Sequence, residues 1–224
     1  IGFDSEGNID EAAITTFCTG TTCTVYQWLD QSGNGNDATA ASTGVEPTIY
    51  TGGAIVKENG KLALDFDGGK VLTESIDWAP RSTFLLTQTN GAGGPQQNIL
   101  RKGSSPSDRF IYRFNTAGNE YRAIDAGFGN LTYSSSIETK YLFNQTLDGG
   151  TKTLQVNGVL TGTTSGTLGT LTTNPLYIGA FSNESFNGIA QEILFYTSAK
   201  SGTDQTSIEE NIGDYFTQNT PLLD

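Results

Sequence analysis

The chain has 224 residues, of which 35% are hydrophobic and 10% aromatic, enough to bury the core of one sizeable β domain. Lys and Arg total 12 against 24 Asp and Glu, so the formal net charge of −12 would repel nucleic-acid phosphates, and we expect no nucleic-acid partner. No apolar run reaches membrane-spanning length, so we expect no membrane insertion.

The first segment predicts a short helix. Asp10 and Glu11 stand directly before Ala12-Ala13-Ile14, and acidic residues are favoured in the first turn of a helix. We therefore expect a turn followed by a short helix ahead of Phe17.

Cys18 and Cys23 are the two cysteines of the chain. They could form a disulfide, contribute to a metal site or stay as two unrelated thiols. Because the chain has no His, a zinc site would need carboxylates for its remaining ligands, which disfavours a metal. We favour a small disulfide loop that contributes about 2 kcal/mol. A disulfide would indicate an oxidising compartment, and hence secretion or exposure on a virion or cell surface.

The next stretch combines a predicted strand with a polar loop. Residues Thr24 to Leu29 are rich in β-branched and aromatic side chains and favour a half-buried strand, and the Gly and Asn of 30–37 favour a turn. Asp30, Asn34 and Asp37 offer oxygen atoms that could hold calcium, although the EF-hand pattern is incomplete. Asp30 could instead cap the turn by accepting backbone N–H groups, which we favour. Calcium is thus a candidate ligand, and no cofactor is required.

A family resemblance enters at these residues. Cys18-Thr-Gly-Thr-Thr-Cys23, followed by the segment that ends in Asp-Gln-Ser-Gly-Asn-Gly-Asn36, resembles the start of the catalytic domain of α-L-arabinofuranosidase B and of its laminin-G-like relatives, which have a concanavalin A-like jelly-roll fold. Four later segments resemble successive strands of that sandwich: Leu64–Gly68, Asp148–Gly158, Leu176–Gly179 and Phe186–Tyr196. The resemblance implies one domain over 1–224, excised from a longer polypeptide. It leaves the activity open, because laminin-G-like domains serve as lectins, adhesion modules, phage surface proteins and enzyme appendages.

The rest of the chain predicts short strands separated by Gly, Pro, Ser and Asn, and then a helix at 203–216 whose apolar side chains form one stripe. The fold class is therefore all-β, an antiparallel two-sheet sandwich with short helices in the N-terminal region and at the C-terminus. The strands are expected at Lys61–Phe66, Ser82–Thr89, Asn98–Lys102, Arg109–Asn115, Tyr121–Asp125, Lys140–Thr146, Thr151–Val156, Leu176–Gly179 and Ile189–Tyr196.

Catalysis by a Ser-His-Asp or Cys-His arrangement is excluded by the absence of His. Glycoside hydrolysis would need two carboxyl groups facing each other, for which the candidates are Glu120, Asp125 and Glu192. The resemblance implies two adjacent cysteines at an arabinofuranosidase active site, and this chain has none. We therefore lean against an enzyme and keep hydrolysis as an alternative.

Sugar binding needs aromatic faces beside amides, carboxylates and Arg. In Arg109–Asn115 the aromatic side chains share one face, predicted to be core, which leaves Arg109 and Arg113 on the other. Arg122 adds positive charge on the next strand, which favours an anionic glycan, sulfated or uronic. The predicted ligand-binding residues are Arg109, Arg113, Tyr121, Arg122, Trp78 and Phe181.

The function predicted from sequence is a non-catalytic recognition module outside the cell or on a virion, with a polysaccharide or glycoconjugate as its partner. One alternative is an arabinofuranosidase-like glycoside hydrolase. A second alternative is a structural or adhesion domain of a phage capsid or fibre, whose partner is protein and which could form a homo-oligomer.

Overall fold

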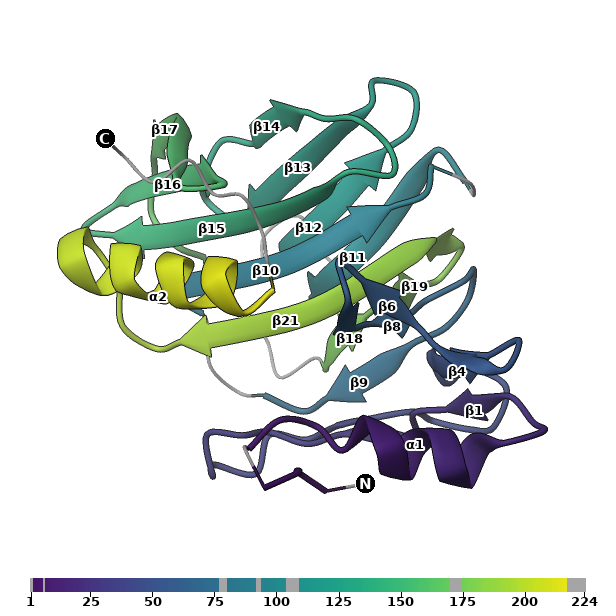
Figure 1. The fold of residues 1–224 in the computed structure, drawn as a ribbon. Coiled ribbons are helices and arrows are strands. Elements are labelled where there is room, and N and C mark those ends of the chain that lie inside the picture. The colour runs from purple at the N-terminus through teal and green to yellow at the C-terminus, as the bar shows by residue number, and fades with distance from the viewer. Residues whose placement is uncertain are drawn as a thin grey trace.

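The computed structural model describes residues 2–5, 7–76, 80–91, 94–103, 109–169 and 175–216. These residues form two stacked β-sheets and two short helices, one near each end of the chain (Figure 1). The strand pairings in the described residues are antiparallel, apart from one parallel bridge between Asn98 and Ser185. The two-sheet β-sandwich predicted from sequence is confirmed.

The first sheet has nine strands in the order β1-β4-β8-β21-β10-β15-β16-β17, with β5 beside β4. Its long central strands match the predicted ones closely, and β10 and β16 have the predicted bounds. The strands are β1 (Cys23–Thr24), β4 (Thr48–Thr51), β5 (Ala54–Ile55), β8 (Leu64–Asp65), β10 (Ser82–Thr89), β15 (Lys140–Asp148), β16 (Thr151–Val156), β17 (Val159–Ser165) and β21 (Gly188–Tyr196).

The second sheet has ten strands in the order β14-β13-β12-β11-β18-β9-β3-β2, with the hairpin β19–β20 beside β11. A separate two-stranded sheet pairs β6 (Lys57–Glu58) with β7 (Lys61–Leu62). The ten strands are β2 (Gln27–Trp28), β3 (Ala38–Thr39), β9 (Leu72–Glu74), β11 (Gln96–Lys102), β12 (Phe110–Asn115), β13 (Glu120–Asp125), β14 (Leu131–Ser134), β18 (Leu176–Ile178), β19 (Ala180–Phe181) and β20 (Glu184–Ser185).

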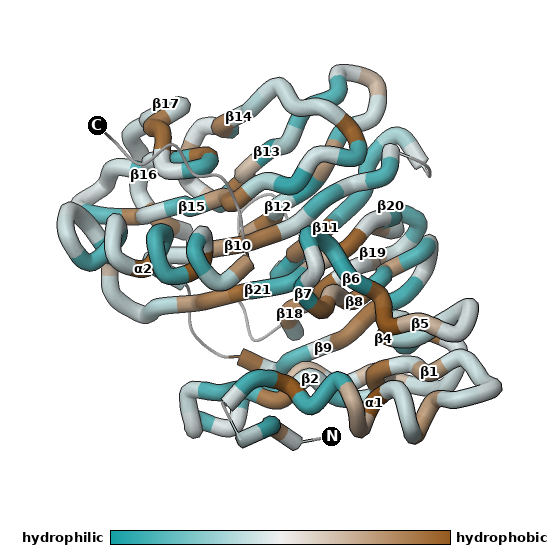
Figure 2. Tube along the Cα trace, viewed as in Figure 1, coloured by the Kyte–Doolittle hydropathy of each residue, from teal (hydrophilic) through white to brown (hydrophobic). Residues whose placement is uncertain are grey.

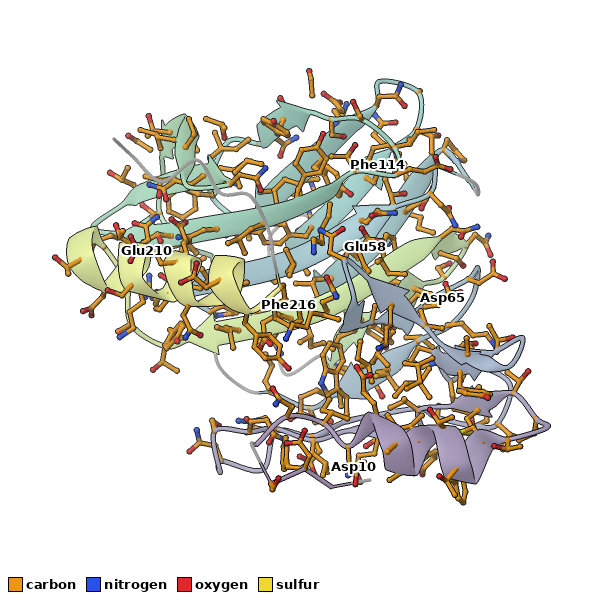
Figure 3. All side chains as sticks on the ribbon, in the orientation of Figure 1. Asp10, Glu58, Asp65, Phe114, Glu210 and Phe216 are labelled. Atoms are coloured by element: carbon orange, nitrogen blue, oxygen red, sulfur yellow. A yellow bond between two sulfur atoms is a disulfide. The ribbon has the colours of Figure 1, made fainter. Side chains whose placement is uncertain are left out.

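The main core fills the space between the sheets, where side chains from both inner faces meet (Figure 3). The aromatic residues of β12, which are Phe110, Tyr112 and Phe114, are all buried there, as the alternation predicts. Alternate residues of β12 therefore point to the outer face of the ten-stranded sheet. This arrangement places the arginines of β12 and β13 outside the core.

A second apolar cluster covers the outer face of the nine-stranded sheet. Helix α2 (Gly202–Tyr215) and the residue after it bring Ile212 and Phe216 onto Phe84, Leu86 and Leu142. The remainder of α2 is mostly hydrophilic (Figure 2). The predicted C-terminal helix is thus confirmed, and the two sheets differ in that α2 covers one of them.

The N-terminal region confirms two predictions. Helix α1 (Glu11–Cys18) begins after Asp10, whose carboxylate accepts a hydrogen bond from the Ala13 N–H at 2.9 Å. Its last residue is joined to Cys23 by a disulfide. The disulfide ties α1 to β1, and α1 packs against β4 and β5.

Two predicted strands are each divided into two. Residues 24–29 do not form one half-buried strand, because the chain passes from β1 in one sheet to β2 in the other, with Tyr26 59% exposed between them. Likewise 61–66 divides into β7 and β8 at Ala63, whose N–H bonds to the Val56 carbonyl. In both places a change of sheet overrides the local β propensity. Within the described residues, neither helix is long and apolar enough to cross a membrane.

Candidate functional site

Three adjacent strands bring guanidinium groups to the outer face of the ten-stranded sheet. Arg101 lies on β11, Arg113 on β12 and Arg122 on β13, and Arg113 stands directly opposite Arg122 in the strand register. Arg109, just before β12, falls on the same side by the alternation of the strand. We call this surface, with its polar and aromatic neighbours, the arginine face. Neither helix of the described residues packs on it.

A carboxylate from the β19–β20 hairpin reaches this face. Glu184 accepts a hydrogen bond from the Asn98 side-chain amide at 2.7 Å and from Arg101 at 3.2 Å, and Arg113 lies 3.9 Å away. Burial lowers the pKa of Arg113, the Glu184 carboxylate opposes that shift, and the neighbouring arginines add to it. The neighbouring arginines therefore lie close enough to Arg113 to repel its charge.

Glu120 and Gln96 complete the polar part of the face. Arg122 donates to Glu120 through two of its nitrogens, from Nε at 2.6 Å, and Arg113 donates to the side-chain oxygen of Gln96. These contacts hold the guanidinium groups in fixed orientations. Arginine held in this way suits planar acidic groups such as carboxylates.

Two aromatic side chains adjoin the arginines. The guanidinium carbon of Arg101 lies 4.0 Å from the centre of the Phe181 ring, and Phe181 meets Tyr177 edge to face at 4.9 Å. Phe181, one of the predicted ligand-binding residues, is half-buried beside the arginine face, whereas Phe186 is fully buried. The hairpin is thus anchored in the core by one phenylalanine and contributes the other to the surface.

Two polar atoms of the arginine face lack hydrogen-bond partners. The side-chain oxygen of Asn98, a residue only 1% exposed, and Nε of Arg113 are buried without a partner in the described part of the chain. Asn98 and Arg113 are opposite each other in the register. Unsatisfied buried polar atoms are uncommon, so two of them on paired residues mark a place where a hydrogen bond from water or a ligand hydroxyl would be favourable.

One of the predicted ligand residues does not belong to this face. Tyr121 points inward, is 1% exposed and lies 4.4 Å, ring to ring, from Phe143, so its prediction as a ligand contact is wrong. It alternates with Arg122, so the two side chains occupy opposite sides of the sheet. Trp78 lies outside the described residues.

The three candidate catalytic carboxylates do not form a pair. Glu120 and Asp125 are five positions apart on β13, so they point to opposite sides of the sheet, and Glu192 belongs to the other sheet. Hydrolysis requires two carboxyl groups facing each other across the glycosidic bond. The predicted catalytic set is therefore contradicted by the strand geometry.

Asp125 has a structural role. It forms an ion pair with Lys152 at 3.0 Å, with the two side chains 1% and 0% exposed, and it also accepts a hydrogen bond from Gln145 at 3.0 Å. Burial raises the pKa of Asp125, and the charge of Lys152 opposes that rise. Such a pair has no access to a substrate.

Glu192 lies on the outer face of the nine-stranded sheet, opposite Leu86 in the register and next to the cluster under α2. It forms no hydrogen bond or ion pair with the residues that the structure describes. Burial raises its pKa from 4.5 to about 7. A raised pKa is a property of many catalytic acids, yet here no second carboxylate accompanies it on the β21 strand.

The predicted calcium loop is held by its own hydrogen bonds. Asp30 accepts from the backbone N–H groups of Ser32 and Asn36 at 2.8 and 3.0 Å, which lowers its pKa to about 2, the Ser32 side chain being the largest cause. Asp37 accepts from the Asp30 N–H at 2.8 Å. The capping role favoured from sequence is thus observed. Across the described ranges, no three or more His, Cys, Asp or Glu side chains group together as metal ligands.

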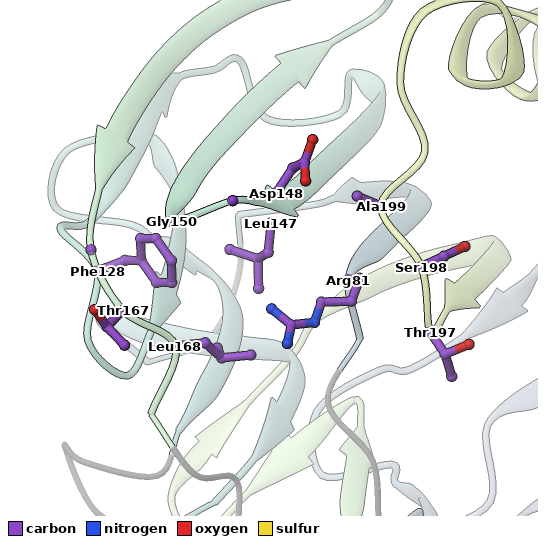
Figure 4. Close-up of a pocket in the computed structure, with 12 residues that line it drawn as sticks. Arg81, Phe128, Leu147, Asp148, Gly150, Thr167, Leu168, Thr197, Ser198 and Ala199 are labelled. Carbon is purple, nitrogen blue, oxygen red and sulfur yellow. The ribbon is translucent and has the colours of Figure 1, made fainter.

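A cavity of about 690 Å³ lies at one end of the sandwich, around the β15–β16 turn (Figure 4). Arg81 points into it beside Leu147 and Leu168, and the carboxylate of Asp148 points away from Arg81. None of the residues predicted to bind a ligand lines it. Asp148 is its one carboxylate among the described residues, so it offers no pair for glycoside hydrolysis.

Sequence reasoning missed Arg101, Asn98 and Glu184. Arg101 and Asn98 stood within a predicted strand, but a bulge between Asn98 and Leu100 shifts their alternation, which obscured the face on which they lie. Glu184 sits in a loop-like segment with no periodicity. The signal for Arg101 was its positive charge within a predicted strand of an acidic chain.

Residues 2–97 match the family model for the catalytic part of α-L-arabinofuranosidase B. The match covers fewer than half of the residues and ends on β11, before β12 and β13 begin. It therefore includes none of Glu120, Asp125 or Glu192. No curated protein sequence matches the chain.

Solved structures similar to this chain share its β-sandwich at low identity. A Trypanosoma rangeli sialidase bound to the inhibitor DANA aligns with a TM-score of 0.57 and 16% identity over 84% of this chain but only 31% of the sialidase. A Ruminococcus gnavus sialidase module, CBM40, bound to α2,3-sialyllactose aligns with a TM-score of 0.50 and 11% identity. The alignment covers 69% of this chain and 96% of the module. Domain 4 of a Geobacillus stearothermophilus extracellular arabinanase, in complex with arabinotriose, aligns with a TM-score of 0.53 and 10% identity. The alignment covers 73% of this chain and 80% of the arabinanase domain. At these identities the likeness shows the fold alone.

Proposed function

We propose that this chain is a non-catalytic carbohydrate-binding module that holds an acidic glycan on the arginine face. The observation that carries the proposal is the convergence of Arg101, Arg113 and Arg122 from three adjacent strands in a chain whose net charge is −12. A cluster of arginines on a chain with an acidic net charge favours anionic partners at that cluster. The nearby Phe181 and Tyr177 supply apolar surface for a sugar ring.

The solved structures named above support the carbohydrate part of this proposal. One of them is the sialidase module CBM40 bound to α2,3-sialyllactose, and another is domain 4 of an arabinanase in complex with arabinotriose. The disulfide between Cys18 and Cys23 supports an extracellular or virion-surface setting, because disulfides persist in oxidising compartments. We further propose that the chain is a single laminin-G-like module of a longer polypeptide.

A glycan array with the purified chain tests the proposal. Wild type should bind carboxylated or sulfated glycans, and the double variant Arg113→Ala, Arg122→Ala should lose that binding at least about tenfold. The variant Lys57→Ala, Arg81→Ala removes the same charge elsewhere and should bind as wild type does. Equal binding by the arginine-face variant and wild type would show that the ligand sits on another surface.

The second candidate, an arabinofuranosidase-like hydrolase, is favoured by the family match over 2–97. Release of arabinose from arabinan or from an aryl arabinofuranoside would establish it. The third candidate, a structural or adhesive phage domain, predicts oligomers in solution and no glycan binding. The arabinose-release assay, the array and light scattering together separate the three candidates.

The proposed binding requires no cofactor, and calcium remains a prediction for the 30–37 loop. Calcium would have to replace the hydrogen bonds that the carboxylates of Asp30 and Asp37 already accept from backbone N–H groups. Millimolar calcium that raises the melting temperature, with reversal by a chelator, would establish a site. An unchanged melting temperature would leave the loop held by hydrogen bonds alone.

A further inference from the structure

The arginine face contains a cradle of hydrogen-bond donors that the protein fills with its own carboxylate. Glu184 accepts hydrogen bonds from the side-chain amide of Asn98 at 2.7 Å and from the guanidinium group of Arg101 at 3.2 Å, and the guanidinium group of Arg113 forms an ion pair with it at 3.9 Å. The donors come from β11 and β12, whereas the carboxylate comes from the β19–β20 hairpin. Convergent donors around one carboxylate have the geometry of an anion site.

The two arginines differ from Arg122 in their setting. Arg101 and Arg113 are only 12% and 15% exposed at their side chains, whereas Arg122 is 30% exposed and pairs with Glu120 from its own strand. Charge pairs closer to the protein interior are less screened by water and salt. The strongest anion-binding position of the face is therefore the one that Glu184 occupies.

Glu184 is itself accessible enough to be displaced. Its side chain is 30% exposed, and it follows a turn in which Ser182 has a φ of +57°. The backbone beside it is anchored independently, since Phe186 is fully buried and its N–H bonds to the Gly179 carbonyl at 2.6 Å. The side chain of Glu184 can leave the cradle without unfolding the hairpin.

We propose that Glu184 is an internal competitor of the acidic group of the ligand, and that it sets the selectivity of the arginine face between acidic and neutral glycans. The proposal rests on the carbohydrate-binding function proposed above and goes further by naming the subsite that takes the acid. A ligand carboxylate or sulfate enters the cradle of Asn98, Arg101 and Arg113 and displaces Glu184. A neutral sugar makes no such exchange, because its hydroxyls form weaker hydrogen bonds with the arginines than a carboxylate does.

The test compares the Glu184→Gln variant with wild type by calorimetry, using 3′-sialyllactose as the acidic probe and lactose as the neutral one. The variant keeps the shape of the side chain and removes its charge. It should bind the acidic probe about tenfold more tightly at low salt and bind lactose unchanged, with the gain shrinking as NaCl is added. Glu184→Asp, which keeps the charge but shortens the side chain, should lie between the two.

Two matched controls isolate the cradle. Glu210→Gln makes the same change in net charge at an exposed position of α2, labelled in Figure 3, and should leave acidic binding as in wild type. Glu120→Gln removes the carboxylate charge that pairs with Arg122, outside the cradle, and should give a smaller gain than Glu184→Gln. Melting curves of each variant show whether it is folded.

The outcomes distinguish this proposal from the proposed function. Equal binding of the acidic probe by wild type and Glu184→Gln overturns the competitor role and leaves carbohydrate binding in place. Absence of binding in both forms overturns both proposals, since the freed cradle should then bind an acid. Acidic binding that appears or strengthens only in Glu184→Gln supports the competitor role.

Discussion

The outer faces of the two sheets differ in the side chains they carry and in whether α2 covers them. On the nine-stranded sheet, Phe84, Leu86 and Leu142 form an apolar surface that α2 covers, and Glu192 lies beside it without a partner in the described part of the chain. On the ten-stranded sheet the outer face is charged, and its carboxylates pair with arginines. One sheet therefore has its outer face covered by α2, whereas neither helix of the described residues packs on the charged outer face of the other.

The largest expected effect comes from the covered face. Phe84→Ala removes a fully buried ring that meets Tyr196 edge to face at 5.9 Å, and we expect it to lower the free energy of unfolding by about 3–5 kcal/mol. Phe181→Ala, the same truncation on the arginine face, should cost only about 1 kcal/mol. Chemical denaturation measures the unfolding free energy of both variants. Equal losses of stability in the two would contradict the difference described between the two outer faces.

Glu192 should make the covered face sensitive to pH. Because burial raises its pKa from 4.5 to about 7, the folded chain keeps a proton that the unfolded chain releases. Stability should therefore fall as pH rises from about 4.5 to 7 and stay level above that range. Glu192→Gln should remove this fall and stabilise the chain by on the order of 2 kcal/mol at pH 8.

Glu210→Gln, on the exposed side of α2, is the matched control for this experiment. It should leave the pH dependence of unfolding as in wild type. If Glu192→Gln shows the wild-type slope between pH 4.5 and 7, the carboxylate is hydrated and the difference between the two faces is smaller than described.

The 30–37 loop contains a carboxylate, Asp30, whose pKa is shifted in the opposite direction from that of Glu192. Its hydrogen bonds lower the pKa of Asp30 to about 2, so its contribution is present above the ordinary value of 3.8 and is lost as pH falls toward 2. Asp30→Asn should destabilise the chain by roughly 1 kcal/mol near pH 6, since solvent screens this partly exposed group. Asp214→Asn, an exposed change on α2, should have no effect in the same unfolding titration.

The smallest effect is expected on the arginine face itself. Glu120→Gln removes one partner of an ion pair that is 30% and 21% exposed at its two side chains, and we expect a change in unfolding free energy of at most about 0.5 kcal/mol. Its effect on glycan binding should exceed its effect on stability. A loss above 2 kcal/mol would mean that this pair holds the sheet together and would remove the contrast with the covered face.

Much of the fold was predictable because it depends on local alternation. The pattern Phe110, Tyr112 and Phe114 placed the core side of β12, and by the same alternation it placed Arg113 outside. The spacing of Cys18 and Cys23 favoured the disulfide that the structure contains. These inferences needed only the period of a strand and the reach of two neighbouring residues.

Other features depended on contacts between distant segments. Tyr121 and Arg122 were both predicted to contact a ligand, and only the partner strands decided that the tyrosine is inside and the arginine outside. Glu184 lies 71 to 86 positions from the residues it contacts, Arg113 and Asn98, so no local pattern could connect them.

The sequence by itself determined the class of fold, the small N-terminal disulfide and the positive charge on β12, since each follows from composition, spacing or a two-residue period. The tertiary structure alone decided which carboxylates meet, which sheet face α2 covers and where the chain changes sheets at 24–29 and 61–66. The physical reason is that side-chain alternation is local, whereas the pairing of charges and the covering of a face depend on which distant segments are brought together.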